Sequence, residues 1–202
     1  MLVVPASRPC AGSRRLGVRA LIAAALTGLA GCTAPPPATP PSPPGTRTSE
    51  PEPFVGTLAA HARWRREVGT GDLVWSDAAA RVAQGWADHL ARDNACEPAH
   101  SPLAAREGIW GENVYSYWRG GTYDGYRRTP AAVVDSWASE KRWYVHASDR
   151  CVAPAGETCG HYTQVVSTYS THVGCGRARC PSAEIWVCNY GPPGNLHGVP
   201  PW

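Results

Sequence analysis

The sequence predicts an α+β protein in which helices and a small antiparallel sheet form one disulfide-linked domain. Helical patterns occupy the region from residue 54 to residue 142, and strand-like patterns follow between residues 161 and 190. This segregation is typical of the α+β class. Eight cysteines accompany a single phenylalanine and a single methionine, which favours covalent cross-links over a large aliphatic core. The length of 202 residues suits one domain with additional tails.

Residues 1–31 have the pattern of a bacterial lipoprotein signal peptide. Four arginines and no acidic residue precede or flank an apolar run, Ala20 to Ala30. This run is shorter than the roughly 20 residues that span a bilayer, but it suits the apolar core of a secretory signal. The small residues that follow it, before Cys32, resemble a lipobox. We expect lipidation of Cys32 and anchoring to a membrane, with an ordinary signal and an incidental cysteine as the alternative.

Residues 32–53 are expected to begin with the lipidated cysteine and to continue as a proline-rich linker. Nine prolines lie between residues 33 and 53. Such a run prefers extended polyproline II structure and forms no core, so it predicts a semi-rigid spacer. A docking site for a proline-recognition partner is the alternative. Thr33, rather than an acidic residue, follows Cys32, which favours the outer membrane in a cell that has one.

Three helices are expected in the first part of the domain, which covers residues 54–202. The first runs from Phe54 to Val68 and ends at a glycine pair. Ser76 is a good N-cap for a second helix that reaches about Asp93. Its apolar face comprises Ala79, Val82, Ala83, Trp86 and Leu90. A threonine and a proline at 129–130 begin a third helix, which runs to about Arg142.

Three strands are expected after the helices. The segments are 162–166, 172–179 and 184–190, which have strand-like patterns and are separated by turn residues. The helices should cover this small antiparallel sheet.

Six of the eight cysteines belong to the domain, because Cys10 lies in the signal and Cys32 is the anchor. An even number in an exported domain predicts three disulfides, whose pairing the spacing leaves open. Local pairing of Cys151 with Cys159 is plausible, and a bridge from Cys96 to the C-terminal strands would close a long loop. The absence of a Cys-x-x-Cys pair speaks against a cysteine zinc site. No thiol is left over as a nucleophile.

Two histidines and two glutamates are candidate site residues. Glu140 shares a helix face with Val133 and Trp137, which should place a carboxylate beside the core. Burial of this carboxylate requires a proton, a cation or strong donors. With Glu112, it could join two histidines in a cleft and bind a divalent metal or perform acid–base chemistry, although the spacing by itself favours structural salt bridges. The histidines are His100 and His161.

Several ordered blocks resemble the CAP superfamily of cysteine-rich secretory, antigen five and pathogenesis-related proteins, whose module is also called the SCP domain. The clearest blocks are Gly-His-Tyr-Thr-Gln-Val-Val at 160–166 and Cys-Asn-Tyr-Gly-Pro-Pro-Gly-Asn at 188–195. Gly-Glu-Asn at 111–113 and Trp-Ala-Ser-Glu at 137–140 match two more. The resemblance is greatest to plant pathogenesis-related type-one proteins and covers essentially all of residues 54–202.

The resemblance implies an α–β–α sandwich with a small central antiparallel sheet and a central cleft. The tetrad of the family maps onto His100, Glu112, Glu140 and His161. Family metal sites, often zinc, use the two histidines, with the glutamates beside them. The family pairing of cysteines implies the bridges Cys96–Cys180, Cys151–Cys159 and Cys175–Cys188.

The sequence departs from the family pattern at three places. Ala62 stands where many members have asparagine, and Ser167 where relatives often have tryptophan. Residues 101–111 form a longer stretch than in the plant proteins, so the assignment of His100 depends most on the structure. His61 is expected to be structural under the first helix. His89 and His146 belong to no motif and are expected at the surface or in structural roles.

The resemblance implies a monomeric, non-enzymatic extracellular module for defence or host interaction, which binds a metal, a sterol or lipid, or a host-surface ligand. A metal-dependent peptidase or esterase is the alternative, with zinc on the histidines and Glu112 or Glu140 as general base. The sequence contains neither a His-Glu-x-x-His nor a Gly-x-Ser-x-Gly motif. Residues 1–31 contain four of the 19 basic residues, so the rest of the chain has 15 basic and 16 acidic residues. This balance gives no support for nucleic-acid binding.

Overall fold

A computed structural model describes residues 45–202, apart from residues 107–108, 119–120 and 122–123. The signal peptide expected over residues 1–31, Cys32 and the expected linker up to residue 44 lie outside the described residues. In the described part of the chain, no helix is long and apolar enough to cross a membrane.

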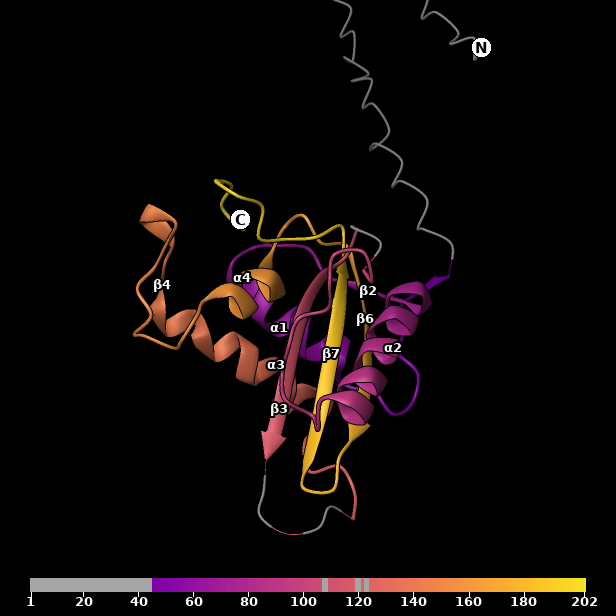
Figure 1. The fold of residues 1–202 in the computed structure, drawn as a ribbon. Helices are drawn as coiled ribbons and strands as arrows, with labels where there is room; N and C mark the ends of the chain where they lie inside the picture. Colours follow the sequence, from indigo (N-terminus) through magenta and orange to yellow (C-terminus); the bar gives the residue numbers. More distant parts are fainter. Residues whose placement is uncertain (1–44, 107–108, 119–120, 122–123) are drawn as a thin grey trace, which may run out of the picture. The chain divides into compact units, whose positions relative to one another are not determined.

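A five-stranded sheet forms the middle layer of the domain, with the strand order β1-β2-β6-β7-β3. Strands β2 and β6 are parallel, and all other neighbours are antiparallel. Helix α2 covers one face, while the other face is covered by α1, α3 and α4 (Figure 1). The bounds are β1 Thr46–Arg47, β2 Val74–Ser76, β3 Gly111–Trp118, β6 His172–Arg179 and β7 Ala183–Gly191.

The four helices are α1 Thr57–Glu67, α2 Asp77–Asp93, α3 Pro130–Ala138 and α4 Gly160–Val166. The side chain of Ser76 accepts a hydrogen bond from the N–H of Ala79, as expected for the N-cap of α2. The Thr129 side chain likewise caps α3. The third helix ends before Arg142 as an α-helix, because α3 continues as the 3₁₀ helix η1, Ser139–Trp143. A small hairpin follows, with β4 Tyr144–Val145 and β5 Arg150–Cys151 joined through the 3₁₀ helix η2, His146–Ser148.

The strand expected over residues 162–166 is wrong, because this segment is helix α4. Its β-branched and aromatic residues are typical of a buried strand, but contacts with the rest of the fold favour a helix. The Glu140 carboxylate accepts hydrogen bonds from the N–H groups of His161 and Tyr162 in the first turn. These groups would lack helical partners without it. Most of the helix surface is buried, which explains an apolar run without amphipathic spacing.

The segment before residue 54 contacts the fold. Strand β1 pairs with β2, so residues 46–47 already belong to the sheet. Glu50 lies near the start of α1, where its carboxylate accepts hydrogen bonds from the N–H groups of Gly56 and Leu58. The last part of the expected linker, residues 46–53, therefore contacts the sheet and the first helix.

Three disulfides join the elements. Cys96–Cys180 connects the segment after α2 to the end of the β6–β7 hairpin, and Cys175–Cys188 links two directly paired positions of that hairpin. Cys151–Cys159 joins β5 to the start of α4. These are the pairs that the resemblance implies, and they complete the α–β–α arrangement.

His61 is a structural residue, as the sequence led us to expect. Its ring is fully buried, with Nδ1 2.8 Å from the Thr57 carbonyl and Nε2 3.0 Å from the Tyr190 hydroxyl. Nδ1 therefore donates, and Nε2 accepts from the phenol. Burial lowers the pKa of His61 to about 4, opposed by the Thr57 hydrogen bond and assisted by the nearby positive charge of Arg65.

We expect His61 to make folding stability depend on pH between about 6.5 and about 4. The unfolded imidazole titrates near 6.5, so in this window the unfolded chain binds more protons and stability falls as pH falls. The shift corresponds to a loss of about 3 kcal/mol, since each pKa unit is worth about 1.4 kcal/mol. Urea unfolding of wild type and His61→Gln at both ends of the window measures it. The exposed His89→Gln is the control, and equal pH dependence in His61→Gln and wild type would contradict this role.

Candidate functional site

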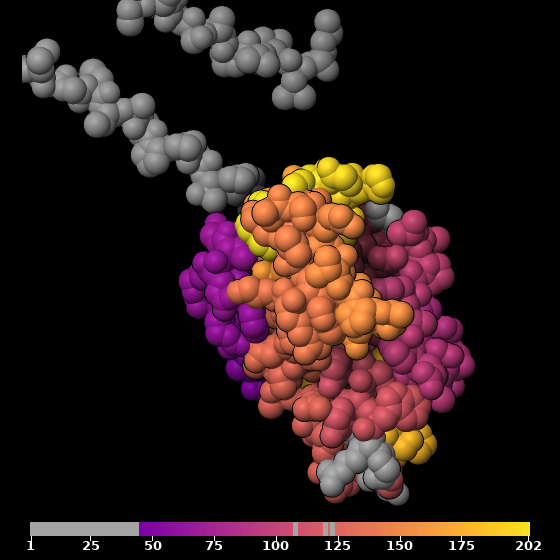
Figure 2. Space-filling view, turned by 90° about the vertical axis from the view of Figure 1, so that its left-hand side faces the viewer, coloured from indigo at the N-terminus to yellow at the C-terminus, as the bar shows by residue number. Residues whose placement is uncertain are grey.

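Four side chains from four parts of the chain meet at the outer edge of β3. His100 follows α2, Glu112 is the second residue of β3, Glu140 lies in η1 and His161 is the second residue of α4. Glu112 pairs with Asn189 of β7, which pairs in turn with Gly174 of β6. Residues paired in this way direct their side chains to the same face of the sheet, and a Cβ atom at Gly174 would point toward α2. The carboxylate of Glu112 therefore lies on the α2 side of the sheet. The pair from η1 and α4 comes from the other side. Figure 2 shows α3 and α4 in orange with magenta segments of α2 and its following loop beside them.

The first pair joins His100 to Glu112. The Nδ1 atom of His100 lies 2.9 Å from Oε1 of Glu112. Ser101 completes the carboxylate environment, with its N–H 2.9 Å from Oε1 and its hydroxyl 2.6 Å from Oε2. The Glu112 side chain is wholly buried, whereas that of His100 is 57% exposed. The carboxylate is thus a fixed acceptor that orients an accessible imidazole.

The second pair joins His161 to Glu140. Nδ1 of His161 lies 2.6 Å from Oε1 of Glu140, and the N–H of His161 donates to Oε2 at 2.9 Å. The same carboxylate therefore fixes both the ring of His161 and the first turn of α4. Its side chain is 11% exposed, so Glu140 is held nearly as firmly inside the protein as Glu112.

The two imidazoles face each other. Their ring centroids are 6.3 Å apart at an interplanar angle of 29°. His161 also stacks on Trp137, with 6.4 Å between centroids and an angle of 22°. Trp137 is itself held in place because its indole N–H donates to the Val114 carbonyl at 3.1 Å. His161 therefore has both the Trp137 indole and the His100 imidazole as ring neighbours.

This hydrogen bonding sets the chemistry available to the histidines. A carboxylate can only accept, so the Nδ1–H of each neutral imidazole donates to its glutamate and Nε2 carries the lone pair. A histidine that donates Nδ1–H to a carboxylate is the usual form of a metal-ligating histidine. Among the described residues there is no group of three or more histidine, cysteine or acidic side chains placed to hold a metal. The donor set fits a metal held by two imidazoles, with the remaining positions left to water or a ligand.

A pocket of 320 Å³ lies beside the tetrad and follows β3. One wall is the segment 98–100, and the other carries Ser136, Trp137, Glu140 and His161, with Val114, Tyr115 and Ser116 along β3. A smaller pocket of 100 Å³ reaches the tetrad from the side of Gly160 and Asn195. Two of the four tetrad residues, one from each pair, therefore open into both pockets: His100 and His161.

Sequence reasoning missed the residues that support the tetrad. Ser101 holds Glu112, and Asn113 donates its amide N–H to the His161 carbonyl at 3.0 Å. Their sequence signal is adjacency to a tetrad member, which alone predicts no contact. Ser167 is fully buried, and its carbonyl accepts from Arg65 at 2.8 Å.

The described contacts of Ala62, His89 and His146 lie elsewhere in the fold. Ala62 lies on α1, which packs against α3 and α4. His89 pairs with Asp93, and His146 stacks on Trp202 at 4.6 Å and 4°. The long segment 101–111 holds Ser101 at its start and still brings His100 to the site.

Comparisons with known proteins agree with this fold. Residues 58–190 match the sequence pattern of the cysteine-rich secretory protein family, CAP. Pathogenesis-related protein 1C of Nicotiana tabacum is 41% identical over 146 residues, which cover 72% of this chain and 78% of the relative. The structure of BmVAL-1 matches with a TM-score of 0.50 and 30% identity, over 64% of this chain and 63% of that one. Schistosoma mansoni venom allergen-like protein 4 has the same fold, with a TM-score of 0.53 and 20% identity over 71% and 90% of the two chains.

Proposed function

We propose that this chain, which belongs to the cysteine-rich secretory protein family, is an extracellular ligand-binding module with a divalent metal site in its cleft. Its relation to pathogenesis-related proteins supports the extracellular role. The observation that carries the proposal is the pair of imidazoles whose Nδ1 atoms are both committed to buried or nearly buried carboxylates. Both Nε2 atoms then offer lone pairs on adjacent, parallel rings. The ligands are His100 and His161, and the two glutamates orient them.

Zinc is the metal that this donor set suits best. Zinc accepts imidazole nitrogen readily, and sites with open positions retain water or a ligand oxygen. Bound there, a zinc ion would supply positive charge that polarises an oxygen of the ligand. Glu112 and Glu140 fix the ring orientations through Nδ1, which keeps both Nε2 atoms directed away from the carboxylates.

We expect the purified chain to bind about one Zn²⁺ per molecule and the His100→Ala/His161→Ala variant to lose this binding. Removal of both imidazoles leaves no nitrogen ligand in the tetrad, so calorimetry should show affinity at least about a hundredfold weaker. His89→Ala is the matched control, because His89 is paired with an acid elsewhere. A wild-type protein that takes up no zinc at micromolar concentration contradicts the metal proposal. Zinc-dependent hydrolysis of peptide or ester libraries would instead support the hydrolase alternative.

The place of action follows from the disulfides and the N-terminal sequence. Disulfides persist in oxidising compartments, and this domain contains three of them. We further propose that Cys32 is lipidated and holds the domain at a membrane surface of the cell envelope. Acylation contributes about 0.8 kcal/mol per buried methylene, so several chains anchor a protein stably.

A Cys32→Ala variant is therefore expected to move from the membrane fraction to the soluble exported fraction. Fractionation of cells that express each form, followed by immunoblotting, measures the shift. Cys10→Ala, within the expected signal, is the matched control and should leave the fractionation unchanged. Retention of Cys32→Ala in the membrane fraction would exclude anchoring through this cysteine.

A further inference from the structure

The outer edge of β3 lines the pocket of 320 Å³ beside the tetrad and has no neighbouring strand among the described residues. Strand β3 ends the order β1-β2-β6-β7-β3, and in the described part of the chain no strand lies beyond it. Its inner edge is fully paired with β7 from Gly111 to Trp118. An edge strand presents unpaired N–H and C=O groups that can pair with another chain.

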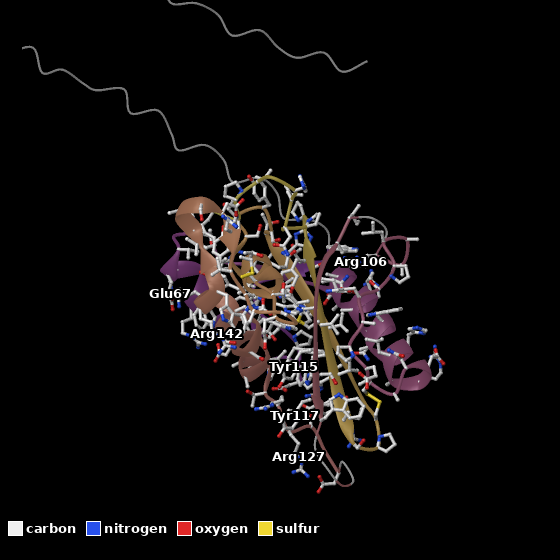
Figure 3. All side chains as sticks on the ribbon, turned by 60° about the vertical axis from the view of Figure 1, so that its left-hand side comes forward. Glu67, Arg106, Tyr115, Tyr117, Arg127 and Arg142 are labelled. Atoms are coloured by element: carbon white, nitrogen blue, oxygen red, sulfur yellow. A yellow bond between two sulfur atoms is a disulfide. The ribbon has the colours of Figure 1, made fainter. Side chains whose placement is uncertain are left out.

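The indole of Trp137 shows which backbone groups point outward. Its N–H reaches the carbonyl of Val114, so this residue directs its backbone groups away from β7. Along an antiparallel strand successive residues present their N–H and C=O groups to alternate sides. Ser116 therefore also faces outward, whereas Tyr115 between them bonds to β7. Figure 3 places Tyr115 and Tyr117 along this strand.

Residues from both neighbouring layers line the pocket beside this edge. Pro98 and Ala99 line the pocket from the α2 side, where Ser116 also donates its hydroxyl to the Cys96 carbonyl at 2.8 Å. Ser136 and Trp137 line it from the α3 side. The pocket of 320 Å³ thus lies where the next strand of the sheet would be, and it ends at the two imidazoles.

We propose that an extended peptide binds in this pocket as an additional strand paired with the outer edge of β3, beside the tetrad. The inference rests on the proposed function for the location of the ligand site, but strand pairing itself requires no metal. Main-chain hydrogen bonds provide affinity in such complexes, and alternate side chains of the peptide meet the two walls. One set faces Pro98 and Ala99, and the other faces Ser136 and Trp137.

The partial charges at the edge favour a peptide over an apolar ligand. Ser116 offers a positive N–H and a negative C=O group toward the pocket, whereas the Val114 carbonyl already accepts from Trp137 and only the N–H of Val114 points outward beside it. Another extended backbone carries the complementary pattern. A lipid chain would remove these groups from water without replacing their hydrogen bonds, which costs about 1–3 kcal/mol for each. The opposite edge of the sheet is β1, with only two residues, so it offers much less backbone for pairing.

The test uses two variants at one residue. Ser116→Pro removes the outward N–H and leaves the inner ladder intact, since proline is tolerated on the open side of an edge strand. Ser116→Ala is the matched control, because both variants lose the hydroxyl bond to Cys96 but only proline loses the N–H. A library of random octapeptides is selected on the full wild-type chain, and the enriched peptides are measured by calorimetry against all three proteins. Thermal unfolding shows whether each variant is folded.

We expect enriched peptides to bind wild type and Ser116→Ala within about threefold of each other and Ser116→Pro at least about tenfold more weakly, a difference of about 1.4 kcal/mol. Amide hydrogen exchange at Val114 and Ser116 should slow on binding while that at Tyr115 changes little. Equal binding to folded Ser116→Pro, or slowing at Tyr115 alone, overturns the inference. If Ser116→Pro is poorly folded, amide hydrogen exchange at Val114, Ser116 and Tyr115 of the wild type decides whether the inference holds.

The same measurements separate this inference from the metal proposal. Peptide binding by His100→Ala/His161→Ala without zinc supports strand pairing even where the metal proposal fails. If the wild type binds zinc but enriches no peptide relative to Ser116→Pro, strand pairing is overturned and the metal proposal is unaffected.

Discussion

Replacement of Cys96 and Cys180 by alanine is expected to lower the free energy of unfolding by about 4–5 kcal/mol, most of the stability of an ordinary domain. The bridge closes a loop with a sequence separation of 84 residues. Because the entropy lost by the unfolded chain grows with loop length, this crosslink should stabilise more than the two shorter ones. Urea unfolding of the oxidised proteins measures the difference.

The native surroundings of this bridge add to its expected effect. Cys96 is fully buried, and both it and Ala95 have positive φ, 63° and 50°, where residues with a side chain are disfavoured. The bridge holds this turn against the end of the β6–β7 hairpin. Without it, the turn is free to relax, and the segment that carries His100 loses its attachment. We therefore expect weaker zinc binding as well as lower stability.

The control is Cys151→Ala/Cys159→Ala, which opens a loop with a separation of only eight residues. The same entropy relation gives about 2.5 kcal/mol for that loop. Cys151 is exposed, so little packing should be lost there. Equal losses from the two double variants would contradict the dominant role of the long loop.

The sequence predicted the elements whose signals are local. The cap at Ser76 places α2, and threonine with proline at 129–130 places α3. Alternation and turn residues place β6 and β7 within a residue of their bounds. These signals lie within a few residues of the feature that they define, so no tertiary information is needed to interpret them.

Elements that depend on tertiary partners escaped prediction. Helix α4 has strand-like residues and becomes a helix where the Glu140 carboxylate meets its first turn. Strand β3 is defined by pairing with β7, which lies far along the sequence from it. Strand β1 has two residues and is a strand only because it lies beside β2. In each case the deciding contact comes from a distant part of the chain.

The site was predictable in part from its own residues. The helical spacing of Glu140 behind Trp137 predicted a carboxylate at the edge of the core, and its residue exposure is 9%. The partnership of His100 with Glu112 came only from family resemblance, since no spacing rule connects a loop to an edge strand. Ser101 shows why: its N–H and hydroxyl both bind Glu112, and only the folded chain brings them there.

Gly174→Ala is expected to lower the free energy of unfolding by at least about 3 kcal/mol, at the upper end of the cost of overpacking. A Cβ atom at this position in β6 would lie 2.2 Å from the backbone nitrogen of Ala80 and 2.3 Å from the carbonyl oxygen of Ser76. Both are backbone atoms at the start of α2, so no side-chain rotation can relieve the overlap. Helix α2 must move away from the sheet, which opens the alanine-lined contact between them.

A second glycine, on helix α2 itself, is expected to have the opposite effect on stability when replaced by alanine. Gly85 lies inside α2 and is exposed, and a Cβ atom added there would meet no other atom within 4 Å. Gly85→Ala should therefore stabilise the protein by about 1 kcal/mol through helix propensity alone. Urea unfolding of Gly174→Ala, Gly85→Ala and wild type tests both signs in one series. If Gly174→Ala is as stable as wild type, α2 does not pack against β6 as closely as the structure shows, and the position of Ser101 and His100 after that helix must be reconsidered.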